Sequence, residues 1–391
     1  MVDEIQVDSL VVGGGVAGLF TLHALRETGS SALLVESRAL GLGQTTSSQG
    51  ILHAGVKYAL GGVAGEDATE ASEAAALWAN FLQGRSGPDL RGLRVLATHE
   101  YLWRTASLMG AAGMLGARLA LRTRPSMVEP SERPAWLAGM RGDVLSLPET
   151  VIDPGDLLRR LAAAASGAIA LGQVRAIQAE AGSATLRIEG EGRVAQVRAR
   201  RVFLCAGTGN EGLLTLAGLG SAEPMQRRPL RQAMVRGALP MVFGHCIDGA
   251  RTRITVTSDS DAGHTIWHIG GELAEKGPAM QPDAFIRHAR EEVAACMPGV
   301  SLAGTEWSSY AVDRAEPRTP DARRPSSAFV HANGAVVVTW PVKLVLAPRA
   351  AQAAAEHART GRDGTDRWPS GWTTPPLAPR PWHEATWTRL P

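Results

Sequence analysis

One histidine of the chain, His53, stands where a proton acceptor would be useful. It follows a run of hydroxylated residues, TTSSQG from Thr45 to Gly50, and it precedes a Gly55-x-x-Tyr58 pattern. A neutral imidazole titrates near physiological pH, so it is suited to removing the proton of a hydroxyl group. A histidine in this position can equally hydrogen-bond a cofactor or a neighbouring carbonyl, and the residues leave both roles open.

The segment before this histidine carries a dinucleotide-binding pattern. An apolar strand from Leu10 to Val12 runs into GGGVAG, a helix follows, and a second strand from Ala32 to Val35 ends on Glu36. The glycines that fit G-x-G-x-x-G are Gly13, Gly15 and Gly18. They permit the tight turn, the approach of a pyrophosphate to the backbone and close packing of helix on strand. The start of the helix then attracts the phosphates, and Glu36 accepts hydrogen bonds from a ribose diol.

NAD dehydrogenases usually continue with further βα units, but this chain runs from Glu36 into a loop rich in glycine and hydroxyl groups, ALGLGQTTSSQGILHAGVKY. Here the sequence resembles the D-amino-acid-oxidase superfamily of FAD enzymes, and most closely the branch of glycerol-3-phosphate dehydrogenase and L-2-hydroxyglutarate oxidase. In that branch a Thr/Ser-rich stretch leads into a His-x-Gly-x-x-Tyr pattern, which residues 53–58 match. The resemblance implies FAD as the cofactor.

The resemblance also implies which residues hold FAD. The hydroxylated loop would contact the phosphates, Gln49 and Gly50 would pass near the isoalloxazine, and His53 would lie on the substrate side. A strand that runs into Ala206-Gly207 resembles the turn beside the pyrophosphate. The predicted cofactor-binding residues are Gly13, Gly15, Val16, Ala17, Gly18, Glu36, Ser37, Arg38, Thr45, Thr46, Ser47, Gln49, Gly50, Val174, Ala206, Gly207, Val342, Lys343 and Leu344.

The C-terminal part departs from the family pattern. Many relatives have a glycine-rich turn where this chain has WPVKL, so Lys343 either supplies positive charge at the N1–C2=O edge of the flavin or lies at the surface. The Arg-Pro-x-Thr-Pro-Asp run is altered to EPRTPD, which displaces the usual arginine, and Arg314 is the replacement that we expect. Guanidinium groups suit bidentate recognition of anions, and Arg251, Arg253 and Arg314 are the candidates. The predicted catalytic residues are His53, Arg314, Arg253 and Lys343.

The expected fold class is α/β, with a Rossmann-like FAD-binding domain and an α+β substrate domain. The first has a discontinuous parallel sheet, and the second has a large antiparallel sheet, because long alternating strands separated by turn signals follow Met225. The FAD-binding domain is expected in residues 1–85, 149–222 and 316–360. The substrate domain is expected in residues 86–148 and 223–315, and a Pro/Trp-rich tail in residues 361–391.

The bulk composition excludes several classes of partner. The net charge is only +2 and the basic residues are spread along the chain, so no nucleic-acid partner is predicted. Cys205, Cys246 and Cys296 lie far apart without a C-x-x-C, which predicts neither a disulfide framework nor a metal site. No secretory leader and no apolar run of membrane-spanning length is visible, so we expect a cytoplasmic protein without a transmembrane segment.

The predicted function is FAD-dependent oxidation of a small anionic hydroxy substrate, a 2-hydroxy acid or a polyol phosphate, with hydride transfer to flavin N5. The alternative is an amine or amino acid, including a biosynthetic intermediate, for which His53 would only position groups. A flavin-binding protein without turnover is a third reading, because a fold alone does not fix function. The electron acceptor is oxygen, a quinone or a protein, and the residues do not choose among them.

Overall fold

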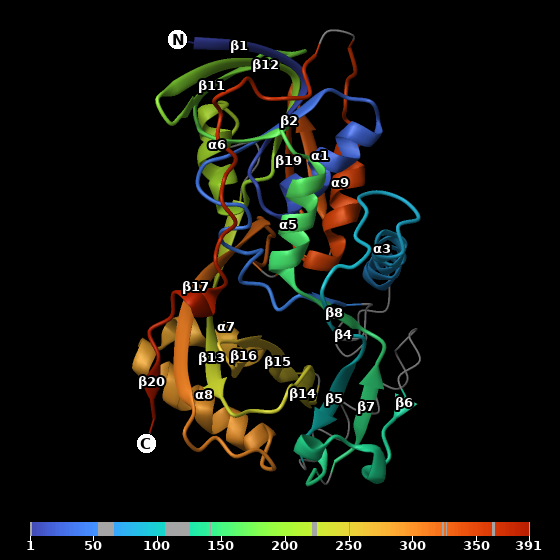
Figure 1. The fold of residues 1–391 in the computed structure, drawn as a ribbon, viewed down its shortest axis with the longest axis vertical. Helices are drawn as coiled ribbons and strands as arrows, with labels where there is room; N and C mark the ends of the chain where they lie inside the picture. The colour runs from blue at the N-terminus through green and yellow to red at the C-terminus, as the bar shows by residue number, and fades with distance from the viewer. Residues whose placement is uncertain are drawn as a thin grey trace.

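The computed structural model describes residues 2–53, 66–105, 126–140, 142–220, 225–249, 251–322, 324–325, 327–361 and 364–390. Gly55, Lys57 and Tyr58 of the predicted histidine pattern lie outside these residues. Two large sheets lie one beyond the other along the longest axis of the molecule (Figure 1). The N-terminal strand belongs to one of them, and the C-terminal tail runs from that sheet to the other.

The first sheet has eight strands among the described residues, and its centre is parallel. Its parallel strands are β1 (Val2–Val12), β2 (Ala32–Glu36), β9 (Ile169–Leu171), β12 (Arg193–Leu204) and β19 (Val336–Trp340). Its antiparallel strands are β10 (Gln173–Ala179), β11 (Ala184–Gly190) and β18 (Phe329–Asn333). The central strands are apolar runs buried on both faces, as expected for a parallel sheet covered by helices.

Helices pack around this sheet and hold the first helix in place. Helix α1 (Val16–Glu27) directly follows β1 and packs against α9 (Ala347–Ala355) and α5 (Pro154–Ala164). Helix α5 begins at Pro154, because the carboxylate of Asp153 accepts the N–H of Gly155 at 2.8 Å and proline is favoured in the first turn. Helix α3 (Glu66–Leu82) contacts α9.

The second sheet has nine strands among the described residues, in the order β20-β17-β13-β16-β15-β14-β5-β7-β6. All neighbouring strands are antiparallel except β14 and β5. The bounds are β5 (Glu100–Arg104), β6 (Ser126–Met127), β7 (Val144–Leu147), β13 (Met225–Gly237), β14 (Gly244–Asp248), β15 (Arg251–Asp261), β16 (His264–Gly270), β17 (Glu306–Pro317) and β20 (Thr388–Arg389). Helices α7 (Glu272–Lys276) and α8 (Pro282–Cys296) pack against it.

A third, small sheet connects the two large ones. It consists of β3 (Ile51–Leu52), β8 (Thr150–Ile152) and β4 (Val95–Ala97), and β8 and β4 lie between the large sheets in Figure 1. His53 comes directly after β3, and Glu149 directly before β8. The small sheet therefore brings two titratable residues to the boundary between the large sheets.

Each large sheet has its own apolar core, one built on β1, β2 and β12 and one that includes the indoles of Trp103, Trp267 and Trp307. The tail joins both: the indole of Trp368 donates to Leu34 O at 3.1 Å, while β20 pairs with β17. The predicted fold class is confirmed, and the six segment boundaries stay a prediction. Within the described residues, no helix is both long and apolar enough to cross a membrane.

Candidate active site

A cavity of about 1040 Å³ opens at the carboxyl ends of β1, β2, β12 and β19, where ligands bind in open α/β sheets. Its volume lies at the upper end of the range for ligand pockets. All the predicted cofactor-binding residues line it except Gly18 and Thr46, and so do His53 and Arg314. Residues of β13, β15, β16 and β17 close it from the other sheet. The cavity is thus shared between the two sheets.

In the turn between β1 and α1, each of the three motif glycines is needed for a different structural reason. Gly13 has a φ of +110°, and a Cβ there would lie 2.6 Å from the Cα of Ala206. A Cβ on Gly18 would lie 1.9 Å from the carbonyl oxygen of Gly13, so Gly18 serves packing and not the cavity. A Cβ on Gly15 would meet only Thr45 Oγ1, at 3.3 Å. Of these three glycines, Gly15 therefore leaves the most room for a ligand in the cavity.

The N-terminus of α1 has no side-chain cap on its N-cap residue, Gly15. One of its first N–H groups, that of Val16, donates to Thr45 Oγ1 at 3.1 Å. Uncapped N–H groups and the positive end of the helix dipole form a site for an anion. At the end of β2, the Glu36 carboxylate accepts the N–H of Gly14 at 2.7 Å and that of Arg38 at 2.9 Å, which fixes it at the edge of the cavity.

The hydroxylated loop contributes unequally to the cavity. Thr45 and Ser47 line it, whereas Thr46 is buried behind it and donates to the carbonyl of Gly41 at 3.1 Å. The Gln49 amide donates to the carbonyls of Thr255 and His268 at 3.0 and 2.9 Å. These two bonds tie the loop to β15 and β16, so the loop holds the two sheets together at the cavity.

The turn after β19 forms a further part of the cavity wall. Lys343 is buried there and lines the cavity, and Leu344 begins the short helix that leads into α9. Val342 beside it has a φ of +62°. A β-branched residue in the left-handed region is strained, and such strain persists where the surrounding structure holds it in place.

The predicted arginines separate into two places. Arg314 on β17 lines the cavity together with Arg324, and no hydrogen bond to its Nη1 is present among the described residues. Burial, with the nearby charges of Arg324 and Arg228, lowers the pKa of Arg314 to about 10. Arg253 lies outside the cavity, where Glu292 of α8 accepts from its Nη2 at 2.8 Å, and Arg251 is exposed.

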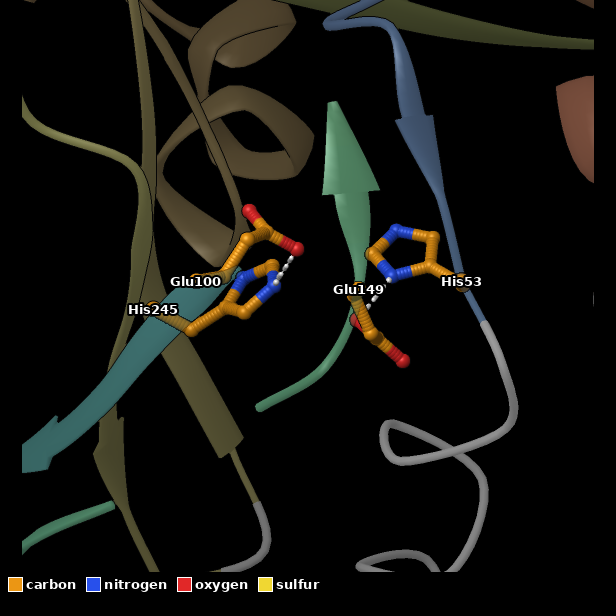
Figure 2. Close-up of side chains that lie close together, drawn as sticks. All are labelled: His53, Glu100, Glu149 and His245. Atoms are coloured by element: carbon orange, nitrogen blue, oxygen red, sulfur yellow. Dashed lines mark hydrogen bonds and ion pairs between the residues drawn. The ribbon is translucent and has the colours of Figure 1, made fainter. Parts of the chain in front are cut away.

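His53 lies at the cavity wall beside three residues that the sequence did not single out, Glu149, Glu100 and His245 (Figure 2). His53 Nδ1 lies 3.1 Å from Glu149 Oε2, and the two side chains point toward one another. Burial lowers the pKa of His53, while the bond to Glu149 acts in the opposite direction. The neutral imidazole is therefore favoured, oriented by a carboxylate that is 1% exposed.

No local pattern in the sequence points to these neighbours. Glu149 is 96 positions from His53, and only the antiparallel pairing of β3 with β8 brings them together. Arg324 is likewise brought to the cavity by tertiary structure, from an arginine pair with no distinguishing spacing.

Comparisons with known proteins also indicate an FAD-dependent oxidoreductase. A family model described as FAD dependent oxidoreductase (DAO) matches residues 8–356. The probable FAD-dependent oxidoreductase PA4991 of Pseudomonas aeruginosa is 39% identical over 392 residues, which is 97% of each protein. Its crystal structure has a TM-score of 0.81 to this chain at 34% identity, covering 98% of this chain and 99% of that one.

Two solved structures are more distant. Glycine oxidase from Geobacillus kaustophilus has a TM-score of 0.65 at 17% identity and covers 92% of this chain and 97% of its own. Dithionite-reduced L-α-glycerophosphate oxidase from Mycoplasma pneumoniae, with FAD bound, has a TM-score of 0.67 at 16% identity and covers 94% of this chain and 100% of its own. At these identities the likeness is one of fold.

Proposed function

Because the chain belongs to the DAO family of FAD-dependent oxidoreductases, we propose that it oxidises a small anionic hydroxy compound, a 2-hydroxy acid or a polyol phosphate. FAD is the cofactor, and when bound it supplies the acceptor for a hydride from the substrate carbon. The chain's own residues must bind the cofactor, hold the anion and accept the hydroxyl proton.

The residues present fit FAD. At Gly15 the backbone lines the cavity and a Cβ would meet only Thr45 Oγ1, so a phosphate can approach it there, beside the start of α1. A carboxylate, Glu36, stands at the end of the neighbouring strand for a ribose diol. Lys343 lies on the same cavity, where positive charge can stabilise negative charge on the cofactor.

The observation that carries the choice of a hydroxy substrate is the imidazole–carboxylate pair on the cavity wall. If His53 Nδ1–H donates to Glu149, the lone pair lies on Nε2, where it can accept the hydroxyl proton. Glu149 fixes the ring and stabilises the imidazolium that forms. A neutral amine can lose hydride without a proton acceptor. An oriented imidazole therefore favours a hydroxy substrate over an amine.

Arg314 and Arg324 support an anionic substrate. Both line the cavity, and Arg314 Nη1 is 3.6 Å from Glu275, too far for a hydrogen bond. A buried guanidinium without full hydrogen bonding is costly, and a carboxylate or phosphate satisfies it in a bidentate manner. The fold likeness to L-α-glycerophosphate oxidase is in keeping with a polyol phosphate.

The second candidate substrate is an amine or amino acid. The fold likeness to glycine oxidase favours it, and an amino-acid carboxylate would suit Arg314 equally well. In that case His53 is a positioning residue, and flavin reduction should accelerate with the fraction of neutral amine.

Anaerobic flavin reduction by a panel of 2-hydroxy acids, polyol phosphates and amino acids tests this proposal. We expect a hydroxy compound to bleach the flavin band, and His53→Asn to slow the reduction by about 100-fold or more at unchanged FAD content. The matched control is His264→Asn, at an exposed histidine that starts β16 and lies outside the cavity. Bleaching by amino acids alone, with His53→Asn within about threefold of the unaltered enzyme, overturns the proposal in favour of the amine.

A further inference from the structure

We propose that His53, Glu100, Glu149 and His245 bind one divalent transition-metal cation. The four side chains come from four places in the fold: the end of β3, the first residue of β5, the residue before β8, and β14. Figure 2 shows them as two neighbouring pairs, Glu100 with His245 and Glu149 with His53, and each residue offers one ligand atom within 4.8 Å of all the others. The proposal concerns metal binding, and because a metal-bound His53 cannot accept a proton, it describes a form of the protein other than the one that would oxidise a hydroxy substrate.

The distances suit a four-coordinate metal. Nitrogen and oxygen ligands about 2.0–2.2 Å from a tetrahedral Zn²⁺ lie roughly 3.3–3.6 Å from one another. His53 Nδ1 lies 3.1 Å from Glu149 Oε2, and His245 Nε2 lies 3.5 Å from Glu100 Oε2. All four ligand atoms lie within 4.8 Å of one another, which exceeds the tetrahedral edge by at most roughly 1.5 Å, a shift that side-chain rotation can supply.

The donor set selects the class of metal. Two imidazole nitrogens and two carboxylate oxygens suit Zn²⁺, and Mn²⁺ or Fe²⁺ can also bind such a set of ligands. Ca²⁺ and Mg²⁺ prefer shells made entirely of oxygen. Four ligands from the protein complete a tetrahedral shell, which is typical of a structural zinc site.

The burial and charge of the four side chains also favour a divalent cation. The side chains of Glu100 and Glu149 are 0% and 1% exposed, and His245 is also buried. Two carboxylates this close and this deeply buried repel one another, and a cation between them reduces that repulsion. One divalent cation balances both carboxylates and binds both histidines in their neutral form.

Neighbouring groups hold the ligands in place. Thr255 Oγ1 on β15 lies 2.8 Å from His245 Nδ1, so the other ring nitrogen, Nε2, is directed at Glu100. Such a bond to the remote nitrogen of a histidine is a regular feature of metal sites, because it fixes the tautomer and the ring. His245 and Glu100 also sit on β14 and β5, which pair directly with one another.

The site would join the nine-stranded sheet to the small sheet beside the cavity. β14 and β5 belong to the nine-stranded sheet, whereas β3 and β8 belong to the small sheet that continues toward α5. His53 is the ligand that also lines the cofactor cavity. The sequence predicted no metal because its ligands have no characteristic spacing and meet only through strand pairing.

The test is metal binding by the FAD-loaded full chain after treatment with a chelator. We expect one equivalent of Zn²⁺ per chain by elemental analysis and a dissociation constant of about 1 μM or tighter by calorimetry. Glu100→Gln and Glu149→Gln keep the side-chain shape and should each weaken binding by about 100-fold or more. His264→Gln, at the exposed start of β16, is the control and should bind as the unaltered protein does.

Two further readouts keep the result independent of catalysis and of misfolding. Zn²⁺ should raise the Tm of the unaltered protein and not that of the Glu→Gln variants, since a ligand stabilises only the state that binds it. FAD content and circular dichroism show that each variant is folded. A wild-type protein that binds less than stoichiometric Zn²⁺, or Glu→Gln variants that bind as tightly as it does, overturns the proposal.

Discussion

Replacing Gly15 by valine separates cofactor binding from folding. Gly15 has φ −77° and ψ −179°, a backbone conformation open to any residue, and a Cβ there meets only one protein atom within contact distance. The neighbouring glycines are different, because Gly13 has a positive φ and Gly18 packs against the Gly13 carbonyl. The valine side chain would occupy the space through which a pyrophosphate reaches the start of α1.

The size of the effect follows from the hydrogen bonds that are lost. Each charge-assisted bond from a backbone N–H to a phosphate contributes about 1.5–3 kcal/mol. Loss of two of them weakens FAD binding by about 3–6 kcal/mol, which is roughly a hundredfold to ten-thousandfold. The stability of the FAD-free protein should change by less than about 1 kcal/mol, because no core contact is disturbed.

The assay is FAD titration of the apoprotein, followed by flavin fluorescence, together with the Tm of the FAD-free form. Gly182→Val is the matched control, since Gly182 lies in an exposed turn with no atom within 4 Å of its Cβ position. A Gly15→Val protein that purifies with full flavin refutes the assignment of the phosphate site. A large fall in the Tm of its apoprotein would instead make Gly15 a folding residue.

Three further substitutions test other parts of the molecule. Glu36→Ala should weaken FAD binding by about 10-fold or more yet leave the reduction rate of bound flavin intact, and a large rate loss at saturating FAD would contradict this. Thr46→Val removes the bond to Gly41 O and should cost about 1 kcal/mol of stability in urea titrations without changing FAD affinity. Burial and the nearby charge of Arg380 lower the pKa of His268 to about 3, so as pH falls from 7 to 5 the unfolded state takes up a proton and the folded state does not. The unaltered protein should therefore lose about 2 kcal/mol of stability that His268→Gln retains, and equal losses in the two proteins would show that His268 does not titrate on unfolding.

The parts of the site that could be predicted from the sequence are those whose chemistry is local. The turn from β1 into α1 and the acid at the end of β2 lie within one βαβ unit, so spacing alone indicates their roles. The position of the Arg253 side chain could not be predicted, because it depends on which helix covers that face of the sheet. In the structure Arg253 donates to Glu292 of α8 and so points away from the cavity. Thr46 differs from Thr45 for a similar reason: one side chain turns to Gly41 and the other to the cavity.

The environment of His53 depends on pairing between distant strands, which no local pattern encodes. Glu149 reaches it through β8, whereas Glu100 and His245 reach it through β5 and β14. The sequence could therefore identify a histidine suited to proton transfer, but neither the carboxylate that orients it nor the second histidine that completes a set of metal ligands.

These neighbours give His53 two roles that exclude each other. An imidazole bound to a metal has no basic nitrogen to accept a proton, so the zinc-loaded protein should not perform the hydroxyl oxidation that depends on His53. We expect stoichiometric Zn²⁺ to slow flavin reduction by a hydroxy substrate by about 100-fold, and chelation to restore the rate. Unchanged reduction in a protein shown to hold one zinc would mean that His53 is not the proton acceptor, and would favour an amine substrate. Failure to bind zinc at all would remove the metal site and leave the proposed oxidation standing.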